Sequence, residues 1–324
     1  MNVFFDKLIN MYNIGMTEQI TSAFSMPLSD RPLISVVTAV YNRKEKLFEL
    51  YQSLEKQTNK NFEWIVVDDG STDGVGEMIK DLAPDFTLRF FKQENKGKHV
   101  AVNFAVNLID TKLTFIVDSD DILTPDAIET IYRYYEKYPP TNELCGYSFL
   151  RCFPDEKING KLFDEYELIA SYIETRINKD DTNSDKAEVF FTERLREFPF
   201  PEISGEKFIS ESTVWIEMAK KYKMVHVNKV IYTGEYLPDG LTYRGRVKSV
   251  KSPVGRMIRA EKFMDADLKL KYRLKAAIEY VVYGKFAGIS EKDIVRRTNH
   301  KISVVSMMPL GEVIYFSWRR KYAG

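Results

Sequence analysis

Three carboxylates stand within four residues in Asp118-Ser119-Asp120-Asp121, directly after an apolar run at 113–117. Like charges this close raise one another's pKa unless a cation neutralises them. Carboxylate oxygens suit hard divalent ions, and Mg²⁺ or Mn²⁺ bound in this way keeps positions for water and substrate phosphates. The cluster therefore predicts a metal site for a nucleotide diphosphate, where the ion would stabilise charge on a departing diphosphate. A solvated turn that caps the next helix is the simpler interpretation, and we favour the metal because the cluster ends an apolar run.

A second acidic pair, Asp68-Asp69, opens the turn-rich segment 68–74. Aspartate, glycine and serine are ordinary turn residues, but a carboxylate can also accept the N3–H of uracil or the N1–H and amino group of guanine. Tyr41 follows an earlier apolar run and could offer an aromatic face to a base, although a tyrosine of the core is nearly as plausible. Lys98, next to Gly97, could donate to a base oxygen or a phosphate.

Residues 31–135 alternate between runs typical of strands and runs typical of helices. Apolar and β-branched residues predict strands at 33–40, 64–67, 88–91 and 113–117. Helical spacing and capping residues predict four helices. They lie at 44–57, from the end of the 68–74 segment to about residue 82, at 98–109, and from Thr124-Pro125 onward. The alternation indicates an α/β fold with a mostly parallel central sheet flanked by helices. Ligands bind such sheets at the carboxyl ends of the strands, where residues 41–42, 68–69 and 118–121 stand.

The rest of the chain is less regular. Strand patterns fade after residue 140, residues 160–210 are polar and mixed, and the pattern from Gly255 onward is helical. We therefore expect a mainly helical C-terminal extension, and we expect residues 1–30 to form a short helix or an arm. Tyr236 opens a segment that continues to Arg244 and Arg246 and is typical of a mobile basic loop. Such a loop is a candidate lid over a diphosphate, although a plain linker is equally plausible.

The composition is that of a globular protein, with 44% hydrophobic and 29% charged residues. Two cysteines, Cys145 and Cys152, are too few for a disulfide framework. We find neither a signal-peptide pattern nor an apolar stretch of about 20 residues that would span a bilayer, so we expect a cytoplasmic protein. Residues 241–324 hold 19 Lys and Arg against 7 Asp and Glu. This basic region suits an anionic partner such as a membrane surface or a diphosphate group, and a solvated basic helical surface is equally plausible. Its tail at 307–321 would fit peripheral contact with the inner face of a membrane, although we slightly favour packing on the domain.

Four segments together resemble the family-2 glycosyltransferases: 34–42 (ISVVTAVYN), 67–73 (VDDGSTD), 95–98 (NKGK) and 117–121 (VDSDD). They cover roughly a third of the chain, and the combination is specific although each piece is not. The resemblance implies a GT-A fold at 31–235, with a nucleotide-binding half at 31–135 and an acceptor half at 136–235. The basic loop and helical extension would then occupy residues 236–324.

The resemblance also implies roles for individual residues. Tyr41 and Asp69 would line the base pocket, and Asp118-Ser119-Asp120 would be the DxD motif that holds the ribose and the metal. Asp120 and Asp121 are the expected metal ligands, with Mn²⁺ or Mg²⁺ as the cofactor. The candidate nucleotide-sugar-binding residues are Ala39, Tyr41, Asp68, Asp69, Lys98, Asp118, Ser119 and Asp120.

One departure from the family concerns the third helix, where many relatives have an Arg-Asn pair and this chain has Val102-Asn103. The arginine's contact is therefore absent or supplied by Lys98. Transfer also needs a base, because an acceptor hydroxyl is a poor nucleophile at neutral pH. Relatives carry an acid four residues before a bulky residue that opens a helix, and Glu211 fits that spacing before Trp215. Glu206 is the reserve candidate, and an exposed acid at a helix N-terminus is the alternative interpretation of Glu211.

These features predict an inverting glycosyltransferase that moves a sugar from a nucleotide-diphosphate sugar, for which we expect UDP, to an acceptor hydroxyl. The expected acceptor is a saccharide or a lipid-linked molecule in surface polysaccharide or glycolipid assembly, and no nucleic acid is expected as a partner. A nucleotidyltransferase is less favoured, because residues 40–43 are not the glycine-rich basic loop that it would carry after its first strand. A sugar-nucleotide-binding protein with a degenerate site would not need Asp118, Asp120 and Glu211, and a glycoside hydrolase would not need a metal cluster.

Overall fold

The computed structural model describes residues 32–181, 184–236 and 245–322. Contacts divide the chain into two units, Met1–Pro32 and Leu33–Gly324, and the described residues from 33 onward belong to the second. The helix or arm predicted at 1–30 lies outside the described residues.

The first half of the second unit contains four parallel strands, as predicted. They are β1 (Ile34–Val40), β2 (Phe62–Asp68), β3 (Thr87–Lys92) and β4 (Leu113–Ile116). The helices between them are α3 (Lys44–Glu55), α4 (Val75–Lys80) and α5 (Lys98–Leu108). All seven residues of β2 are buried, which explains why this strand is a continuous apolar run without alternation.

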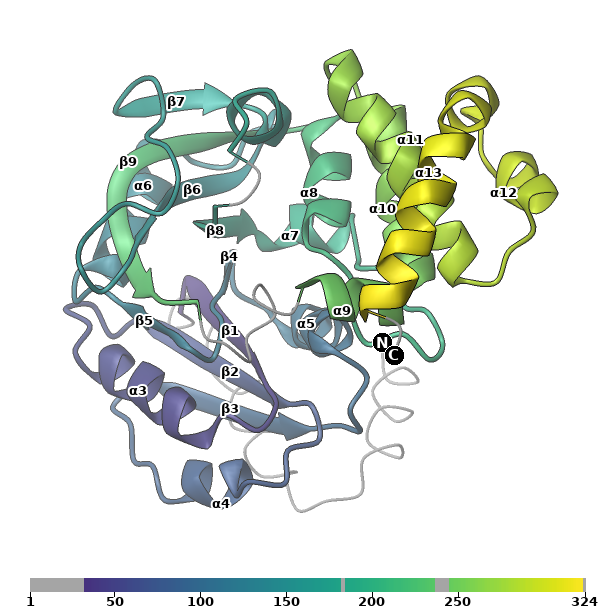
Figure 1. The fold of residues 1–324 in the computed structure, drawn as a ribbon. Helices are drawn as coiled ribbons and strands as arrows, with labels where there is room; N and C mark the ends of the chain where they lie inside the picture. Colours follow the sequence, from purple (N-terminus) through teal and green to yellow (C-terminus); the bar gives the residue numbers. More distant parts are fainter. Residues whose placement is uncertain (1–31, 182–183, 237–244, 323–324) are drawn as a thin grey trace, which may run out of the picture. The chain divides into compact units, whose positions relative to one another are not determined.

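The second half adds five strands to the same sheet, two of which contain most of the new residues. The five are β5 (Asp121–Leu123), β6 (Leu144–Cys152), β7 (Glu167–Ala170), β8 (Lys186–Phe191) and β9 (Lys223–Gly234). Within the described residues the sheet has nine strands in the order β3-β2-β1-β4-β8-β6-β9-β5, with β7 paired to β9 (Figure 1). β5, β7 and β8 run against the other six strands. The predicted α/β fold with a mostly parallel sheet is confirmed.

Two predictions about this half were wrong in detail. Strands do not fade after residue 140, because β6 is buried along all nine residues and β9 pairs with it across irregular register shifts. A strand of this kind has no polar and apolar alternation by which to recognise it. The helix predicted from Thr124-Pro125 begins two residues later, as α6 (Ala127–Lys137). There the Thr124 hydroxyl donates to the Asp126 carboxylate (2.8 Å) instead of capping a helix.

Helices cover both faces of the sheet. On one face, residues of α3, α4 and α6 pack into a core with alternate residues of the strands, among them Val36, Trp64, Phe115 and Val189. On the other face, Ala101 and Ala105 of α5 are fully buried, and α5 contacts β1 and β2. The carboxyl ends of the parallel strands are therefore held between two helical layers.

The predicted helical C-terminal extension is confirmed. It follows α8 (Ser212–Ala219) and β9, and contains α9 (Gly245–Lys251), α10 (Pro253–Asp265), α11 (Leu270–Phe286), α12 (Glu291–Arg297) and α13 (Lys301–Tyr322). Figure 1 shows α13 lying along the outside of this group of helices. Over the described ranges, every helix is too short or too polar to span a bilayer.

Candidate active site

Polar residues that follow β1, β2 and β4 lie at one edge of the sheet. β1 pairs with both β2 and β4 in parallel, so the strands end side by side. The Asp69 amide donates to the Val40 carbonyl (2.8 Å), which carries the pairing one residue beyond the strands. Tyr41 follows β1 and is half exposed, and Ala39 lies in register with Val67 of β2.

The two aspartates of the 68–74 turn hold neighbouring loops. Asp68 is buried, and its carboxylate accepts a hydrogen bond from the Ser71 amide (2.7 Å) and lies 3.4 Å from Lys92 Nζ. Asp69 accepts from the amides of Lys96 and Gly97, both at 2.8 Å. Asp69 therefore fixes the loop that leads into α5, and any contact to a base would use its remaining acceptor capacity.

Asn42 stands at a strand end where the sequence analysis expected ligands, but it was given no role of its own. Its φ of 51° lies in the left-handed region, which asparagine adopts more readily than most residues. In this conformation the side-chain oxygen of Asn42 accepts a hydrogen bond from the Thr72 backbone amide (2.8 Å). The backbone amide of Asn42 donates to the Ser71 hydroxyl (2.9 Å). The asparagine thus joins the turn after β1 to the turn after β2.

Lys98 joins the two candidate halves of the site. Its ammonium contacts the Asp118 carboxylate and lies 2.6 Å from Glu211 Oε1. Burial alone would lower the pKa of Lys98, but the two carboxylates outweigh burial and raise it above its usual range. Lys98 therefore stays charged at neutral pH. The three residues lie up to 113 positions apart in the sequence and meet at one nitrogen.

Each of the other two acids of the cluster has its own cation. Arg43 Nη1 lies 3.4 Å from Asp120 Oδ2, and Arg151 Nη2 lies 3.1 Å from Asp121 Oδ1. Burial and the charge of Asp118 raise the pKa of both Asp120 and Asp121, and the two arginines oppose that rise. Sequence reasoning missed both arginines, because neither stands in a recognisable motif and each pairing depends on how the chain folds.

Glu211 lies directly before α8, where the sequence analysis placed the candidate base. The side chains of Glu211 and Asp118 are 41% and 40% exposed, so both can be reached by a ligand. Withdrawal from bulk water raises the pKa of Glu211, and Lys98 partly offsets the rise. Trp215 anchors the helix by packing on Phe190 of β8, with ring centroids 4.4 Å apart.

Glu206, the reserve candidate, has a different position. Its two carboxylate oxygens accept hydrogen bonds from the amides of Val254 and Gly255, both at 2.7 Å. These amides belong to the first turn of α10, where a carboxylate is favoured by the unpaired N–H groups and the helix dipole. Glu206 therefore fastens the helical extension to the catalytic region, and Glu211 remains the better candidate base.

The Val102-Asn103 pair of α5 has a structural role. Val102 is buried, and the Asn103 side chain exchanges two hydrogen bonds with the backbone of Phe200, both at 2.9 Å. Phe200 packs in turn on Trp215, with ring centroids 5.7 Å apart. The middle of α5 thus helps to position α8 and its preceding residue, Glu211.

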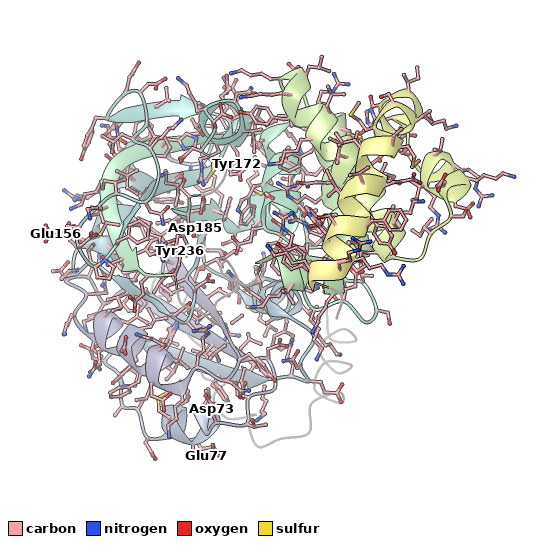
Figure 2. The ribbon with its side chains drawn as sticks, in the orientation of Figure 1. Asp73, Glu77, Glu156, Tyr172, Asp185 and Tyr236 are labelled. Carbon is pink, nitrogen blue, oxygen red and sulfur yellow. The ribbon has the colours of Figure 1, made fainter. Side chains whose placement is uncertain are left out.

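A further polar group lies beside the acidic cluster. Arg151 Nη1 is 3.7 Å from Asp185, whose carboxylate also accepts from the Tyr236 hydroxyl (2.9 Å). Figure 2 shows Asp185 and Tyr236 next to each other. Of the two candidate lid residues, Arg244 lies outside the described residues. Arg246 belongs to α9 and stacks its guanidinium on the Trp318 ring, 3.9 Å from the ring centroid.

Part of the chain that carries this site matches a known protein family. Residues 35–192 match the family model described as Glycosyl transferase family 2. They form a family 2 glycosyltransferase domain. This glycosyltransferase domain includes Tyr41, Asp69, Lys98 and the cluster at 118–121, whereas Glu211 lies beyond the matched residues. The family resemblance predicted from the four segments is confirmed.

Three relatives illustrate the range of the likeness. Glycosyltransferase GlyA of Streptococcus pneumoniae is 28% identical over 215 residues, which is 61% of this chain and 30% of GlyA. S. aureus TarS 1-349 in complex with UDP superposes with a TM-score of 0.60 at 17% identity, covering 89% of this chain and 91% of TarS 1-349. Mannosyltransferase PcManGT from Pyrobaculum calidifontis, in complex with GDP-Man and Mn²⁺, gives a TM-score of 0.52 at 16% identity, covering 94% and 90%.

The sequence relatives and the structural neighbours support different conclusions. The two structural neighbours share the fold, and the GT-A fold predicted from the sequence is confirmed. The chain spans only about a third of the length of the first curated relatives that it matches. The family assignment therefore applies to residues 35–192.

The close approach at Gly97 yields a test of how the site is held together. Gly97 has a φ of +100°, and a Cβ there would overlap the Lys207 backbone, with the carbonyl carbon at 2.8 Å. Gly97→Ala should therefore lower the free energy of unfolding by about 3 kcal/mol, from left-handed strain and overpacking together. The measurement is equilibrium denaturation in urea.

Gly205 supplies a matched control. Its φ of +82° is also left-handed, but no atom lies within 4 Å of the Cβ position. Gly205→Ala should cost only the backbone strain, about 1 kcal/mol. Equal losses in the two variants would show that the contact between Gly97 and Lys207 is not tight.

Proposed function

We propose that this chain is an inverting glycosyltransferase that moves a sugar from a nucleotide-diphosphate sugar, with UDP as the nucleotide, to an acceptor hydroxyl. The observation that carries the proposal is the ammonium of Lys98 between Asp118 and Glu211. The first carboxylate stands in the motif expected to hold the donor, and the second is the candidate base for the acceptor. Membership of a sugar-transferring family and a structural neighbour in complex with UDP support this proposal.

The acidic cluster offers carboxylate oxygens, the ligand type that Mg²⁺ and Mn²⁺ prefer. Asp118 and Asp120 offer carboxylate oxygens that are partly exposed, and burial together with the neighbouring charge of Asp118 raises the pKa of Asp120. A bound cation would relieve this repulsion. We propose that Asp120 and Asp121 would hold Mn²⁺ or Mg²⁺. When bound, the ion would stabilise negative charge on the departing diphosphate.

The residues of the chain divide the remaining work. We assign Tyr41 and Asp69 to the base of the donor, and Lys98 to a phosphate or sugar oxygen. Glu211 takes the proton of the acceptor hydroxyl as that oxygen attacks the anomeric carbon. The charge of Lys98 favours the ionised form of Glu211. A single displacement of this kind inverts the anomeric centre.

We propose a saccharide or a lipid-linked molecule as the acceptor, in the assembly of surface polysaccharide or glycolipid. Asp185 is exposed and accepts from Tyr236, so these two residues offer a polar surface beside Glu211 on which sugar hydroxyls could bind. The alternative of a degenerate sugar-nucleotide-binding protein predicts binding without turnover, and the experiments below distinguish the two.

Removal of the metal ligand should abolish most activity. Asp120→Asn should lower kcat/KM for hydrolysis or transfer of a UDP-sugar by about 100-fold or more, because an amide binds a divalent ion more weakly than a carboxylate. A chelator should remove the activity of the parent, and Mn²⁺ or Mg²⁺ should restore it. Nucleotide release from a panel of sugar nucleotides measures both effects.

Asp126 provides the control for this substitution. It stands six residues later, and its carboxylate pairs with Lys229 at 2.7 Å instead of facing the cluster. Asp126→Asn should keep near-parental turnover. Full activity of Asp120→Asn in the presence of chelator would contradict the proposed metal site.

The identity of the base can be tested with two isosteric substitutions. Glu211→Gln should lower kcat by about 10²- to 10⁴-fold and leave the Kd of the nucleotide nearly unchanged, because only the proton acceptor is lost. Glu206→Gln should retain transfer and lower stability by about 1 kcal/mol, because it weakens bonds to the first turn of α10. Steady-state kinetics, nucleotide titration and thermal melts separate these outcomes, and the reverse pattern would make Glu206 the base.

The pH dependence should reveal the link between Lys98 and Glu211. The base works in its ionised form, so activity falls as the pH drops through the pKa of Glu211. Lys98 lowers that pKa, and Lys98→Met removes this influence. The acidic limb of the kcat/KM profile should therefore move to higher pH in Lys98→Met.

Lys92→Met is the matched control, because Lys92 pairs with Asp68 at the same edge of the sheet (3.4 Å). Its acidic limb should stay at the parental position. An unmoved limb in Lys98→Met would show that Glu211 does not depend on Lys98 for its ionisation.

A further inference from the structure

Helix α13 carries an exposed apolar stripe. Ile302, Val305, Val313 and Phe316 are 88%, 54%, 66% and 58% exposed. Their spacing of three, eight and three residues keeps them on one face of a helix with 3.6 residues per turn. Pro309, also exposed, lies between them on the same face. Four large apolar side chains in one row are unusual on a surface that contacts only water.

The opposite face of α13 is firmly packed, so the direction of the stripe is fixed. Gly311 lies so close to α11 that a Cβ would come within 2.6 Å of Val281. Tyr315 packs edge-on against Phe286 of α11, with ring centroids 4.9 Å apart. Glu312 of α13 is paired with Lys285 of α11 (2.9 Å).

The start of α13 is tied down as well. Glu261 of α10 accepts hydrogen bonds from the Thr298 hydroxyl (2.7 Å) and the Asn299 amide (3.0 Å). His300 Nε2 lies 2.7 Å from Asp265 Oδ1. The carboxylates of Glu261 and Asp265 thus hold the loop before α13 in place. The exposed stripe therefore lies on a helix whose other face is packed against α11.

Positive charge accompanies the stripe. The exposed residues Arg319, Arg320 and Lys321 follow Phe316 at the end of the helix, and Arg246 stacks on Trp318 nearby. The described residues 245–322 contain 18 Lys and Arg against 7 Asp and Glu. On α13 itself the one carboxylate, Glu312, is already paired. An apolar row flanked by cations is the composition of a helix that lies in the plane of an anionic membrane surface.

We propose that α13 docks this chain on an anionic lipid surface, with the stripe at the level of the headgroups and the terminal cations against lipid phosphates. A second copy of the chain is less favoured as the occupant. Two such surfaces would bring together regions that each carry a large excess of positive charge, which repel. This inference does not depend on the proposed reaction, because the stripe contains none of the residues assigned to it.

Vesicle flotation of the full chain tests the proposal. The parent should float with vesicles of phosphatidylcholine and phosphatidylglycerol, and should remain unbound with phosphatidylcholine alone. Val313→Gln/Phe316→Gln should weaken binding to the anionic vesicles by about tenfold or more, because it removes the inserted side chains. Arg319→Ala/Arg320→Ala should weaken binding by a similar factor at low salt and by less at high salt.

Matched controls use exposed residues elsewhere. Leu162→Gln/Ile169→Gln removes two exposed apolar side chains, and Lys56→Ala/Lys80→Ala removes two exposed cations. Both should bind like the parent. Circular dichroism and UDP-sugar turnover without vesicles should be unchanged in the stripe variants, and each single substitution serves if the double variant does not fold.

Three results would overturn the proposal. The first is a parent that fails to bind anionic vesicles, and the second is equal binding by the parent and the stripe variants. The third is a dimer of the parent, seen by light scattering, that the stripe substitutions dissociate while no variant binds lipid. That last result would assign the stripe to a second copy.

Discussion

The pairing of carboxylates with cations at 118–121 is the interaction on which the site depends. Lys98 opens α5, Arg43 precedes α3 and Arg151 lies on β6, so the three cations come from three separate elements. Each pair brings its element to the end of β4. Removing one partner would leave a partly buried charge without compensation, which is strongly unfavourable. The proposed nucleotide-binding and acceptor regions are therefore joined by the same charges that are proposed to do the chemistry.

Helix α5 transmits position between these regions. Its first residue contacts Glu211 through a side chain, and its preceding glycine, Gly97, lies against the backbone of Lys207. Further along, Asn103 is hydrogen-bonded to Phe200. A carboxylate that must lie near a donor sugar is thus located by three contacts to one rigid helix. Such an arrangement holds geometry better than a single ion pair, because each contact constrains a different point of the segment 200–211.

The sequence was informative where local physics decides structure, and silent where distant parts of the chain meet. The parallel strands were predictable because burial on both faces leaves continuous apolar runs, and the positions of Tyr41, Asp69 and Asp118 followed from the ends of those runs. The roles of Arg43 and Arg151 were not predictable, because a basic residue pairs with whichever acid the fold brings near it. β6 was missed because its nine buried residues have no alternation. The structural role of Asn42 could have been predicted, since an asparagine after a buried strand is a common left-handed residue.

The charges of the site do not balance, and the imbalance has a chemical consequence. Asp118, Asp120, Asp121, Asp185 and Glu211 face Lys98, Arg43 and Arg151, so with all groups ionised the site would retain two negative charges. Burial is the main cause of the raised pKa values of Asp120, Asp121 and Glu211, and the charge of Asp118 adds to the rise. A divalent cation would cancel this negative charge and offer a diphosphate a direct ligand, so the site would no longer repel the diphosphate. The acidic cluster therefore favours a cation and a nucleotide diphosphate together more than either one alone.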